Sequence, residues 1–136
     1  MTTTTTQLAA IATASEIDIA TRRNDGTPGR PTTIWVVDVD GQLYVRSYNG
    51  PDGSWYRQAR RIGRGQVTAG GHSYDITFAE PGGVDPASID AAYRRKYARH
   101  GRSYIDAMVN PNAVAATLRL DRQQRRTRDD RHRQQA

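Results

Sequence analysis

The sequence predicts a small α+β domain that is mainly β, built as an antiparallel barrel with flanking helices. Several short stretches alternate apolar and polar residues, which is the period of half-buried strands. Tight-turn signals join these stretches, and only one long helical pattern interrupts them, which favours an antiparallel barrel over a parallel α/β sheet. The 136 residues are enough for one domain with a core and too few for two.

The composition limits the classes of function. The formal net charge is +6, and Lys96 is the only lysine among 20 basic residues. The absence of cysteine excludes disulfides, thiolate catalysis and thiolate metal sites. No apolar run reaches the ~20 residues that span a bilayer, and the first residues, MTTTTTQ, lack the regions of a signal peptide. We therefore expect a cytoplasmic protein that does not enter a membrane.

The first half of the chain predicts a helix, a strand and a hairpin. Residues 7–14 favour a short helix, and residues 16–23 alternate as a strand. Two further strands, residues 32–39 and 42–48, flank Asp40-Gly41, which suits a type I′ turn because both central residues need positive φ. The turn-rich residues 24–29 deliver the chain into this hairpin.

The middle of the chain predicts a helix followed by a second strand pair. Ser54 is a candidate cap for a short helix that contains Trp55 and Tyr56 in its first turn. Residues 65–68 and 73–78 then form two short strands around the glycines that follow Ala69.

Asp85-Pro86 begins the strongest helix pattern, because a capping aspartate precedes proline at the first helical position. Its apolar stripe consists of Ile89, Ala92, Tyr93 and Tyr97, and Gly101 is placed to end it. Ser103 and Asp106 form a capping-box pattern for a helix through Val109, which stops before Pro111.

The last predicted strand is residues 113–120. We expect three parts in the chain: residues 1–15 as a threonine tract and short helix, residues 16–120 as the barrel domain, and residues 121–136 as a charged, disordered tail.

The segment of residues 30–71 gathers hydrogen-bond donors beside aromatic rings, which suits a planar anionic ligand. The residues that this local unit brings within reach of each other are Arg30, Thr32, Arg46, Ser47, Asn49, Trp55, Tyr56 and Arg57. Alternatives remain for several of them. Trp55 and Tyr56 can equally pack a helix onto the barrel core. Arg46 can instead form a salt bridge with Asp38 or Asp40 across the hairpin.

Residues 22–120 resemble the split-barrel flavin-binding superfamily. The resemblance lies in RPTTIWVV, DGQLYVRSYNG, WYRQA, AGG, IDAAYRRKY and ATLRL, and it is strongest to a small uncharacterised bacterial domain family adjoining the deazaflavin-dependent nitroreductases. It implies an FMN-binding type of split barrel. The sequence departs from the nitroreductase pattern at Tyr48, where those relatives have a phosphate-binding lysine, and at Gln58, where they have asparagine. Arg46 or Arg57 could replace that lysine, because a guanidinium contacts phosphate oxygens in pairs.

The resemblance implies a flavin- or deazaflavin-dependent oxidoreductase that acts on a small organic molecule, with FMN or deazaflavin as cofactor and a homodimer with its site at the interface. Arg46, Ser47 and the backbone around Asn49-Gly50 would hold the phosphate. The threonines Thr32 and Thr33 would bind the polar edge of the ring system, and Trp55 or Tyr56 would wall the pocket. No residue stands out as a catalytic acid or base.

Two other functions remain open. The first is a barrel without cofactor that binds a small ligand or catalyses an isomerisation or cyclisation, which the departures at Tyr48 and Gln58 favour. The second is nucleic-acid binding through the basic tail, but aspartates interrupt its arginines and no aromatic-interleaved basic strand is present. The three histidines, His72, His100 and His132, have no spacing that suggests a metal site.

Overall fold

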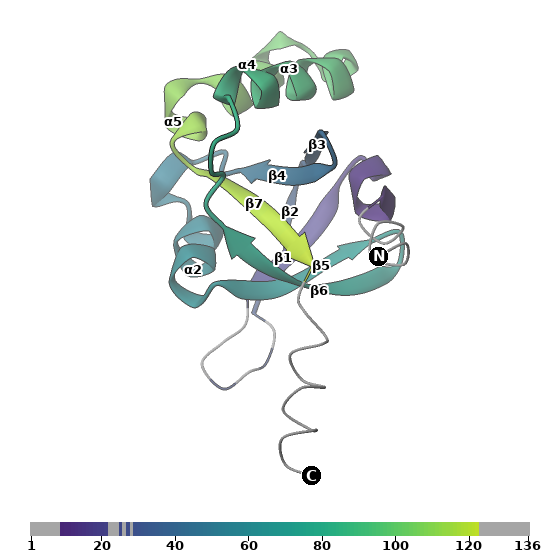
Figure 1. Cartoon of the computed structure of the whole chain (residues 1–136), viewed down its shortest axis with the longest axis vertical. Coiled ribbons are helices and arrows are strands. Elements are labelled where there is room, and N and C mark those ends of the chain that lie inside the picture. The colour runs from purple at the N-terminus through teal and green to yellow at the C-terminus, as the bar shows by residue number, and fades with distance from the viewer. Residues whose placement is uncertain (1–8, 22–24, 26, 28, 123–136) are drawn as a thin grey trace.

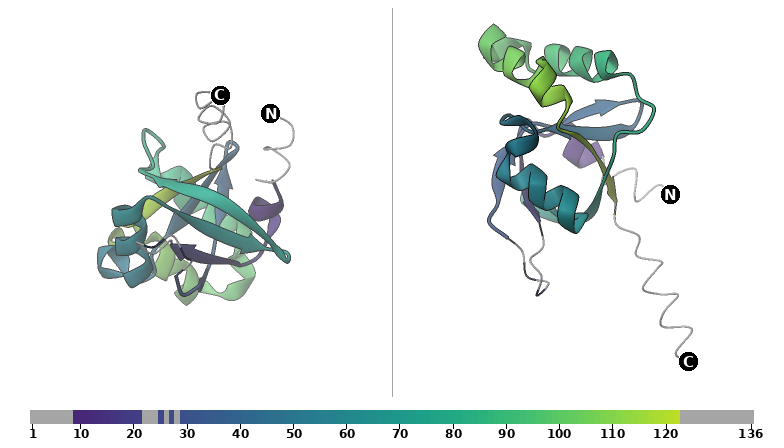
Figure 2. Two further views of the ribbon diagram at one scale, coloured as in Figure 1. Left: turned by 90° about the horizontal axis from the view of Figure 1, so that it is seen from below. Right: turned by 90° about the vertical axis from the view of Figure 1, so that its left-hand side faces the viewer.

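The computed structural model describes residues 9–21, 25, 27 and 29–122, and they form a curled sheet of seven antiparallel strands with flanking helices (Figures 1 and 2). The strands are β1 (Ile17–Thr21), β2 (Thr32–Ile34), β3 (Val37–Val39), β4 (Gln42–Arg46), β5 (Arg64–Ala69), β6 (His72–Ala79) and β7 (Thr117–Arg122). Their order in the sheet is β2-β1-β5-β6-β7-β4-β3. The predicted mainly β barrel is therefore confirmed as a half-barrel.

The helices lie at two places on this sheet. The α-helices are α2 (Ser54–Ile62), α3 (Pro86–Lys96), α4 (Arg102–Val109) and α5 (Pro111–Val114), the 3-10 helices are η1 (Gly50–Asp52) and η2 (Ala98–His100), and residues 9–13 are also helical. Helices α3, α4 and α5 form a layer at one end of the molecule, at the top of Figure 1, and α2 lies on another side of the barrel. None of the helices in the described ranges is long and apolar enough to span a bilayer.

The two edge strands of the sheet come from one bent segment. The sequence predicts a single strand over residues 32–39, but the chain bends at Trp35 and Val36, so that β2 pairs only with β1 and β3 pairs only with β4. The prediction of one continuous strand was wrong because Val36 turns into the interior, where it is fully buried. Because of this bend, β2 and β3, which lie at opposite edges of the curled sheet, are consecutive in the chain.

Both predicted turns of the sheet are confirmed. Asp40 and Gly41 have φ of 53° and 85°, and Val39 pairs with Gln42 across them. The strands β5 and β6 extend the predicted strands by one residue at each end and meet at Gly70 and Gly71, which also have positive φ. Asp40 is the only non-glycine residue with positive φ in the described ranges, and aspartate tolerates that conformation better than most residues.

The core has two parts, one inside the half-barrel and one between the sheet and the helical layer. Ile11 is fully buried in the first part, so the helix over residues 9–13 packs against the barrel. The second part joins Val37 and Tyr44 of the sheet to the helical layer. The whole predicted stripe of α3 is buried there, with Ile89, Ala92, Tyr93 and Tyr97 each no more than 3% exposed.

Several predicted helix ends differ from the structure. Gly53, not Ser54, caps α2, and no side chain bonds to that cap. The Ser103 and Asp106 capping box does not form, since Gly101 caps α4. Gly101 also ends η2 rather than α3, because the α-helix already stops at Lys96.

The prediction of a strand over residues 113–120 was wrong in its first half. Asn110 caps the short helix α5 through a 2.9 Å bond from the Ala113 backbone N–H to its side-chain oxygen, with Pro111 at the first helical position. Asn-Pro here starts a helix, whereas the pattern predicted only that the preceding helix stops before Pro111. The strand β7 begins at Thr117.

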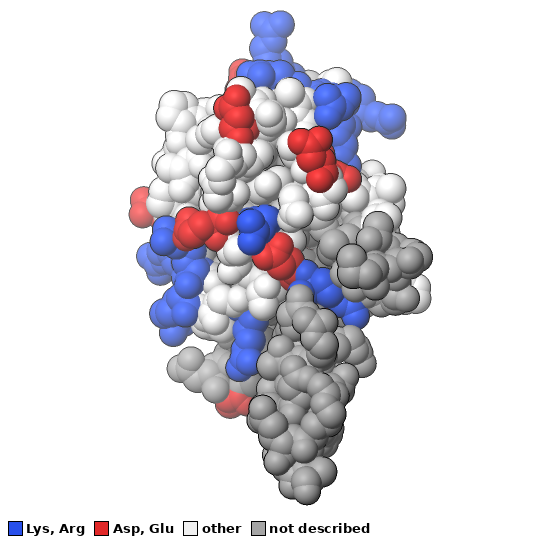
Figure 3. All heavy atoms as spheres, in the orientation of Figure 1, with Lys and Arg blue, Asp and Glu red and all other residues white. Residues whose placement is uncertain are grey.

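Positive and negative side chains are mixed on the face shown in Figure 3. Two ion pairs contribute to this mixing: Arg60 lies 3.1 Å from Glu80, and Arg119 lies 3.0 Å from Asp121. Exposed pairs of this kind add little to stability. Their effect is to break up the basic surface that the net charge would otherwise suggest.

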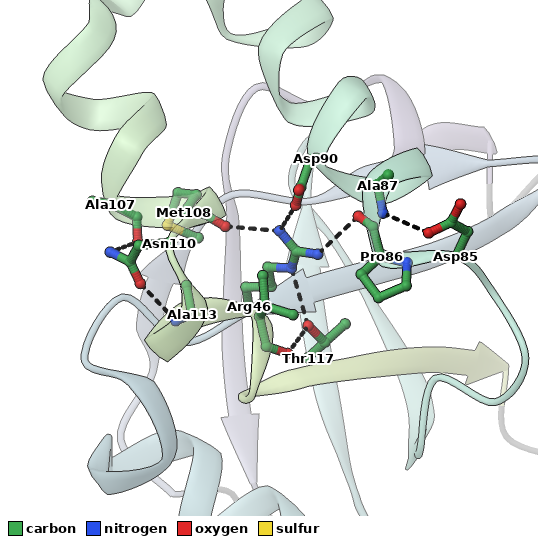
Figure 4. A network of polar contacts seen from close by, with 11 residues as sticks. Arg46, Asp85, Pro86, Ala87, Asp90, Ala107, Met108, Asn110, Ala113 and Thr117 are labelled. Carbon is green, nitrogen blue, oxygen red and sulfur yellow. Dashed lines mark hydrogen bonds and ion pairs between the residues drawn. The ribbon is translucent and has the colours of Figure 1, made fainter.

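A buried arginine joins the sheet to the helical layer (Figure 4). Arg46 ends β4 and is 1% exposed. Its Nη1 pairs with Asp90 of α3 and donates to the Met108 carbonyl of α4 at 2.9 Å. Its Nε donates to the Thr117 hydroxyl at 3.0 Å, and its Nη2 donates to the Pro86 carbonyl at 3.3 Å. The salt bridge predicted with Asp38 or Asp40 is therefore made with an aspartate from another element.

The bend between β2 and β3 is held by two consecutive residues at the end of α3. Lys96 donates from Nζ to the carbonyls of Ala12 and Val36, at 2.8 and 2.7 Å. The Tyr97 hydroxyl accepts from the Val36 N–H at 3.2 Å and lies 2.8 Å from the Ser15 carbonyl, to which it donates. Burial raises the pKa of Tyr97 to about 12 and lowers the pKa of Lys96. These contacts tie the N-terminal helix, the bend and α3 together.

Replacing Arg46 with methionine should lower the free energy of unfolding by about 3 kcal/mol, because it leaves the Asp90 carboxylate without its buried partner. Urea denaturation followed by circular dichroism measures this loss. Arg57→Met is the matched control, since Arg57 is exposed on α2, and it should change stability by less than about 0.5 kcal/mol. Equal, small losses in both variants would show that the network does not hold the two layers together.

The stability of the protein should fall as the pH rises from 10 toward 12, in part through Tyr97. Its folded-state pKa of about 12 lies above the ordinary value of 10, so its contribution is complete below pH 10 and is lost as the pH passes through 12. Tyr97→Phe should be less stable at pH 7 and show a shallower loss of stability over this range. Urea midpoints at pH 8, 10 and 11.5 measure both effects, and an unchanged slope in the variant would contradict the assignment.

Candidate functional site

A cavity with a volume of about 520 Å³ opens between β2, the turn after β4, the start of α2, and the η2–α4 segment. A volume of this size is typical of small-molecule sites. The residues that line it are Glu16, Thr32, Thr33, Ile34, Trp35, Arg46, Ser47, Tyr48, Asn49, Trp55, His100, Tyr104, Ala107 and Met108. The cavity thus combines the predicted segment with a wall from the helical layer.

Six of the ten predicted cofactor-binding residues line this cavity: Thr32, Thr33, Arg46, Ser47, Asn49 and Trp55. The other four lie outside its lining. Arg30 and Arg57 are exposed. Tyr56 is 3% exposed and packs in the barrel core, which is the alternative that the sequence left open for it. Gly50, with φ of 70°, faces the Asn112 side chain, which a Cβ at this position would meet at 2.2 Å.

One end of the cavity has hydrogen-bond donors that no side chain satisfies. The Ser47 hydroxyl is buried and has no hydrogen-bond partner among the described residues. Gly53 lies against it, because a Cβ on Gly53 would come within 2.3 Å of the Ser47 oxygen. Gly53 is also the cap of α2, and no side chain bonds to the first N–H groups of this helix. A hydroxyl beside a helix N-terminus that has no side-chain cap suits an anionic group.

Strand β2 forms a second wall with a free edge. It is the last strand on its side of the sheet, so the outer edge of its backbone pairs with no other described strand. The Thr33 hydroxyl donates to Asp18 at 2.6 Å and is therefore committed, while Thr32 is half-buried. A planar ligand with polar groups along one edge could bond to this backbone.

Aromatic side chains form the remaining walls. Trp35 and Trp55 are half-buried, and the two exposed large hydrophobic residues of the described chain, Tyr48 and Tyr104, also line the cavity at 68% and 64% exposure. Exposed aromatic residues gathered at one opening mark a binding surface. The cavity therefore suits a planar ligand that is partly open to a further molecule.

Sequence reasoning missed the part of the cavity that comes from the helical layer. His100, Tyr104, Ala107 and Met108 lie more than fifty residues after Asn49, and no local pattern connects the two segments. The sequence predicted Trp35 as part of a regular strand. In the structure it lies in the bend after β2 and lines the cavity. The exposed aromatic ring of Tyr104 within a short helix was the one available signal.

The charges of the cavity are nearly balanced. Arg46 is the only Lys or Arg in the lining, and its guanidinium is paired with Asp90. Glu16 and His100 are the other ionisable groups besides the tyrosines. No group of three His, Cys, Asp or Glu residues in the described ranges could hold a metal ion, and His132 lies outside those ranges. Neutral donors, not free cations, must recognise an anion here.

Solved structures with this fold are similar to the chain at low sequence identity. HutZ, the heme storage protein of Vibrio cholerae, is 12% identical with a TM-score of 0.58, over 85% of this chain and 87% of that one. A candidate pyridoxamine 5′-phosphate oxidase from Listeria innocua is 11% identical with a TM-score of 0.58, over 88% and 92%. A conserved hypothetical protein, Rv2991 of Mycobacterium tuberculosis, is 15% identical with a TM-score of 0.54, over 88% and 79%. These are split-barrel folds, as the resemblance implies.

No curated protein matches the chain at a significant level. A bacterial family matches residues 7–120, which include the N-terminal helix, every residue that lines the cavity and most of β7. The chain therefore belongs to the family described as uncharacterized proteins conserved in bacteria (DUF2255).

Proposed function

We propose that the cavity binds a flavin-type cofactor, FMN or a deazaflavin, and that the protein is a cytoplasmic oxidoreductase acting on a small organic molecule. The observation that carries this proposal is the unpartnered Ser47 hydroxyl beside the start of α2, which has no side-chain cap, at one end of a cavity walled by aromatic rings. That arrangement pairs an anion-binding end with a surface for a planar ring. The hydrogen-bond donors present therefore fit a phosphate-bearing flavin.

Each wall of the cavity has a role in this proposal. Ser47, the Asn49 side chain and the first N–H groups of α2 bind the phosphate. The free edge of β2 and the Thr32 hydroxyl bind the polar edge of the ring system, and Trp55 covers part of its surface. Arg46 is a positioning residue, because its donors are taken by Asp90, Met108, Pro86 and Thr117. It fixes the backbone that presents Ser47.

The cofactor, when bound, supplies the hydride chemistry, while the chain binds it, orients it and excludes water. The fold alone does not decide this function. The names of similar structures support a ligand-binding use of the fold, since one is a heme storage protein and another a candidate pyridoxamine 5′-phosphate oxidase.

We also propose that the protein acts as a homodimer, with a second copy covering the open side of the cavity. Tyr48 and Tyr104 stand exposed at that opening, and the edge of β2 is free beside them. The resemblance implies this arrangement, and burial of the two tyrosine rings would complete the cavity.

One observation favours the second candidate function, a barrel without cofactor that binds a neutral ligand or catalyses an isomerisation or cyclisation. The lining has Tyr48 where nitroreductases have a lysine, and its single guanidinium is neutralised by Asp90. A doubly charged phosphate would then rest on neutral donors alone. Direct titration separates the two functions.

Titration of the protein with FMN, FAD and deazaflavin, followed by absorbance and fluorescence, should show saturable binding of at least one of them. Ser47→Ala should weaken that binding about 10- to 100-fold, because a hydrogen bond to a charged group contributes about 1.5–3 kcal/mol. Ser88→Ala is the matched control, since Ser88 is exposed on α3 and does not line the cavity. If folded protein shows no change in absorbance or fluorescence with any of the three cofactors, the result would support the barrel without cofactor. Equal affinities in the two variants would remove Ser47 from the site.

A further inference from the structure

The indole of Trp35 is half-buried and lines the cavity. One of its faces stacks on Tyr97, with ring centroids 3.9 Å apart and planes within 1° of parallel. The His100 ring is tilted and lies 5.2 Å from Trp35 and 5.7 Å from Tyr97. Because His100 is almost equally far from both rings, it lies beside the stack and not over the second face of Trp35. No other aromatic ring of the described residues stacks on Trp35, and because Trp35 lines the cavity, its second face is the one that we assign to a ligand.

Contacts from the end of α3 hold the stack of Trp35 on Tyr97 in place. Tyr97 is 1% exposed, and its hydroxyl bonds to the backbone of the bend that carries Trp35. Lys96 bonds to the carbonyl of Val36, the residue that follows Trp35, and its ammonium lies 5.2 Å from the Tyr97 ring centroid. Trp35 therefore has little freedom to move when a ligand arrives, and a preformed surface binds with a smaller ordering cost.

This surface is built from other elements than the proposed phosphate site. Trp35 comes from the bend after β2, and His100 and Tyr104 come from the η2–α4 segment. The Ser47 end is built from the turn after β4 and the start of α2. The His100 side chain forms no hydrogen bond to any described residue, so its ring nitrogens are available to a ligand beside the stack.

We infer that Trp35 and His100 form a second binding subsite, for a planar aromatic molecule that carries a carbonyl oxygen. The aromatic plane stacks on the second face of Trp35, and a His100 ring N–H donates to the carbonyl oxygen. The inference rests on the proposed function only in naming this molecule as the substrate of the bound cofactor. The subsite itself is a property of these residues whether or not a cofactor binds.

Calorimetric titration of the protein with 2-acetylnaphthalene tests the subsite directly. We expect saturable binding to the wild type and to Trp35→Phe, and at least tenfold weaker binding to Trp35→Leu, which removes the stacking surface. His100→Ala should bind about fivefold more weakly, whereas His72→Ala, an exposed histidine on β6 outside the cavity, should bind as the wild type does. Acetylcyclohexane, which has the same carbonyl without the aromatic plane, should not bind.

The two tryptophans allow a test of whether the two sites are separate. They are the only ones in the chain, and both line the cavity, so Trp55→Phe leaves Trp35 as the single reporter. In that variant 2-acetylnaphthalene should quench the remaining tryptophan emission, and saturating FMN should leave its dissociation constant unchanged within twofold. Competition between FMN and 2-acetylnaphthalene would overturn a separate subsite, as would equal binding by the wild type and Trp35→Leu. Failure of FMN to bind would contradict only the proposed function, because the titration without FMN still decides the subsite.

Discussion

The buried guanidinium of Arg46 is the contact on which the arrangement of the two layers depends. It leaves the end of β4 and reaches the carboxylate of Asp90, the carbonyls of Pro86 in α3 and Met108 in α4, and the hydroxyl of Thr117. A buried charge is costly unless it is paired and its donors are satisfied. The sheet and the helical layer can therefore meet in only a narrow range of relative positions. This also fixes the shape of the cavity between them.

A second constraint acts at the other wall of the cavity. The backbone of Val36 is held by Lys96 and Tyr97, and this fixes the point where one segment leaves the first edge of the sheet and enters the last. The same contacts place Trp35 on Tyr97. Ser47 and Trp35 are thus positioned by two groups of contacts, one centred on Arg46 and the other on the end of α3, and α3 takes part in both.

The sequence predicts what local chemistry determines. The Asp40-Gly41 turn follows from the φ values that it requires, and the buried face of α3 follows from the period of its apolar residues. Contacts between distant segments were out of reach. Asp90 lies 44 residues after Arg46, so the salt bridge was assigned to nearby aspartates, and His100 could not be linked to Trp35. For the same reason the six cavity residues that were predicted all lie within residues 32–55, and none lies in the helical layer.

The bend at Trp35 and Val36 also couples the movements of the two edge strands of the half-barrel, β2 and β3. In an ordinary open sheet the two edges move independently, since many residues of chain separate them. Here two residues connect the edges, so a displacement of β2 passes directly to β3 and, through buried Val37, to the helical layer. A ligand that displaces β2 on one side of the cavity therefore also displaces the helical layer on the other side, and no hinge between domains is needed.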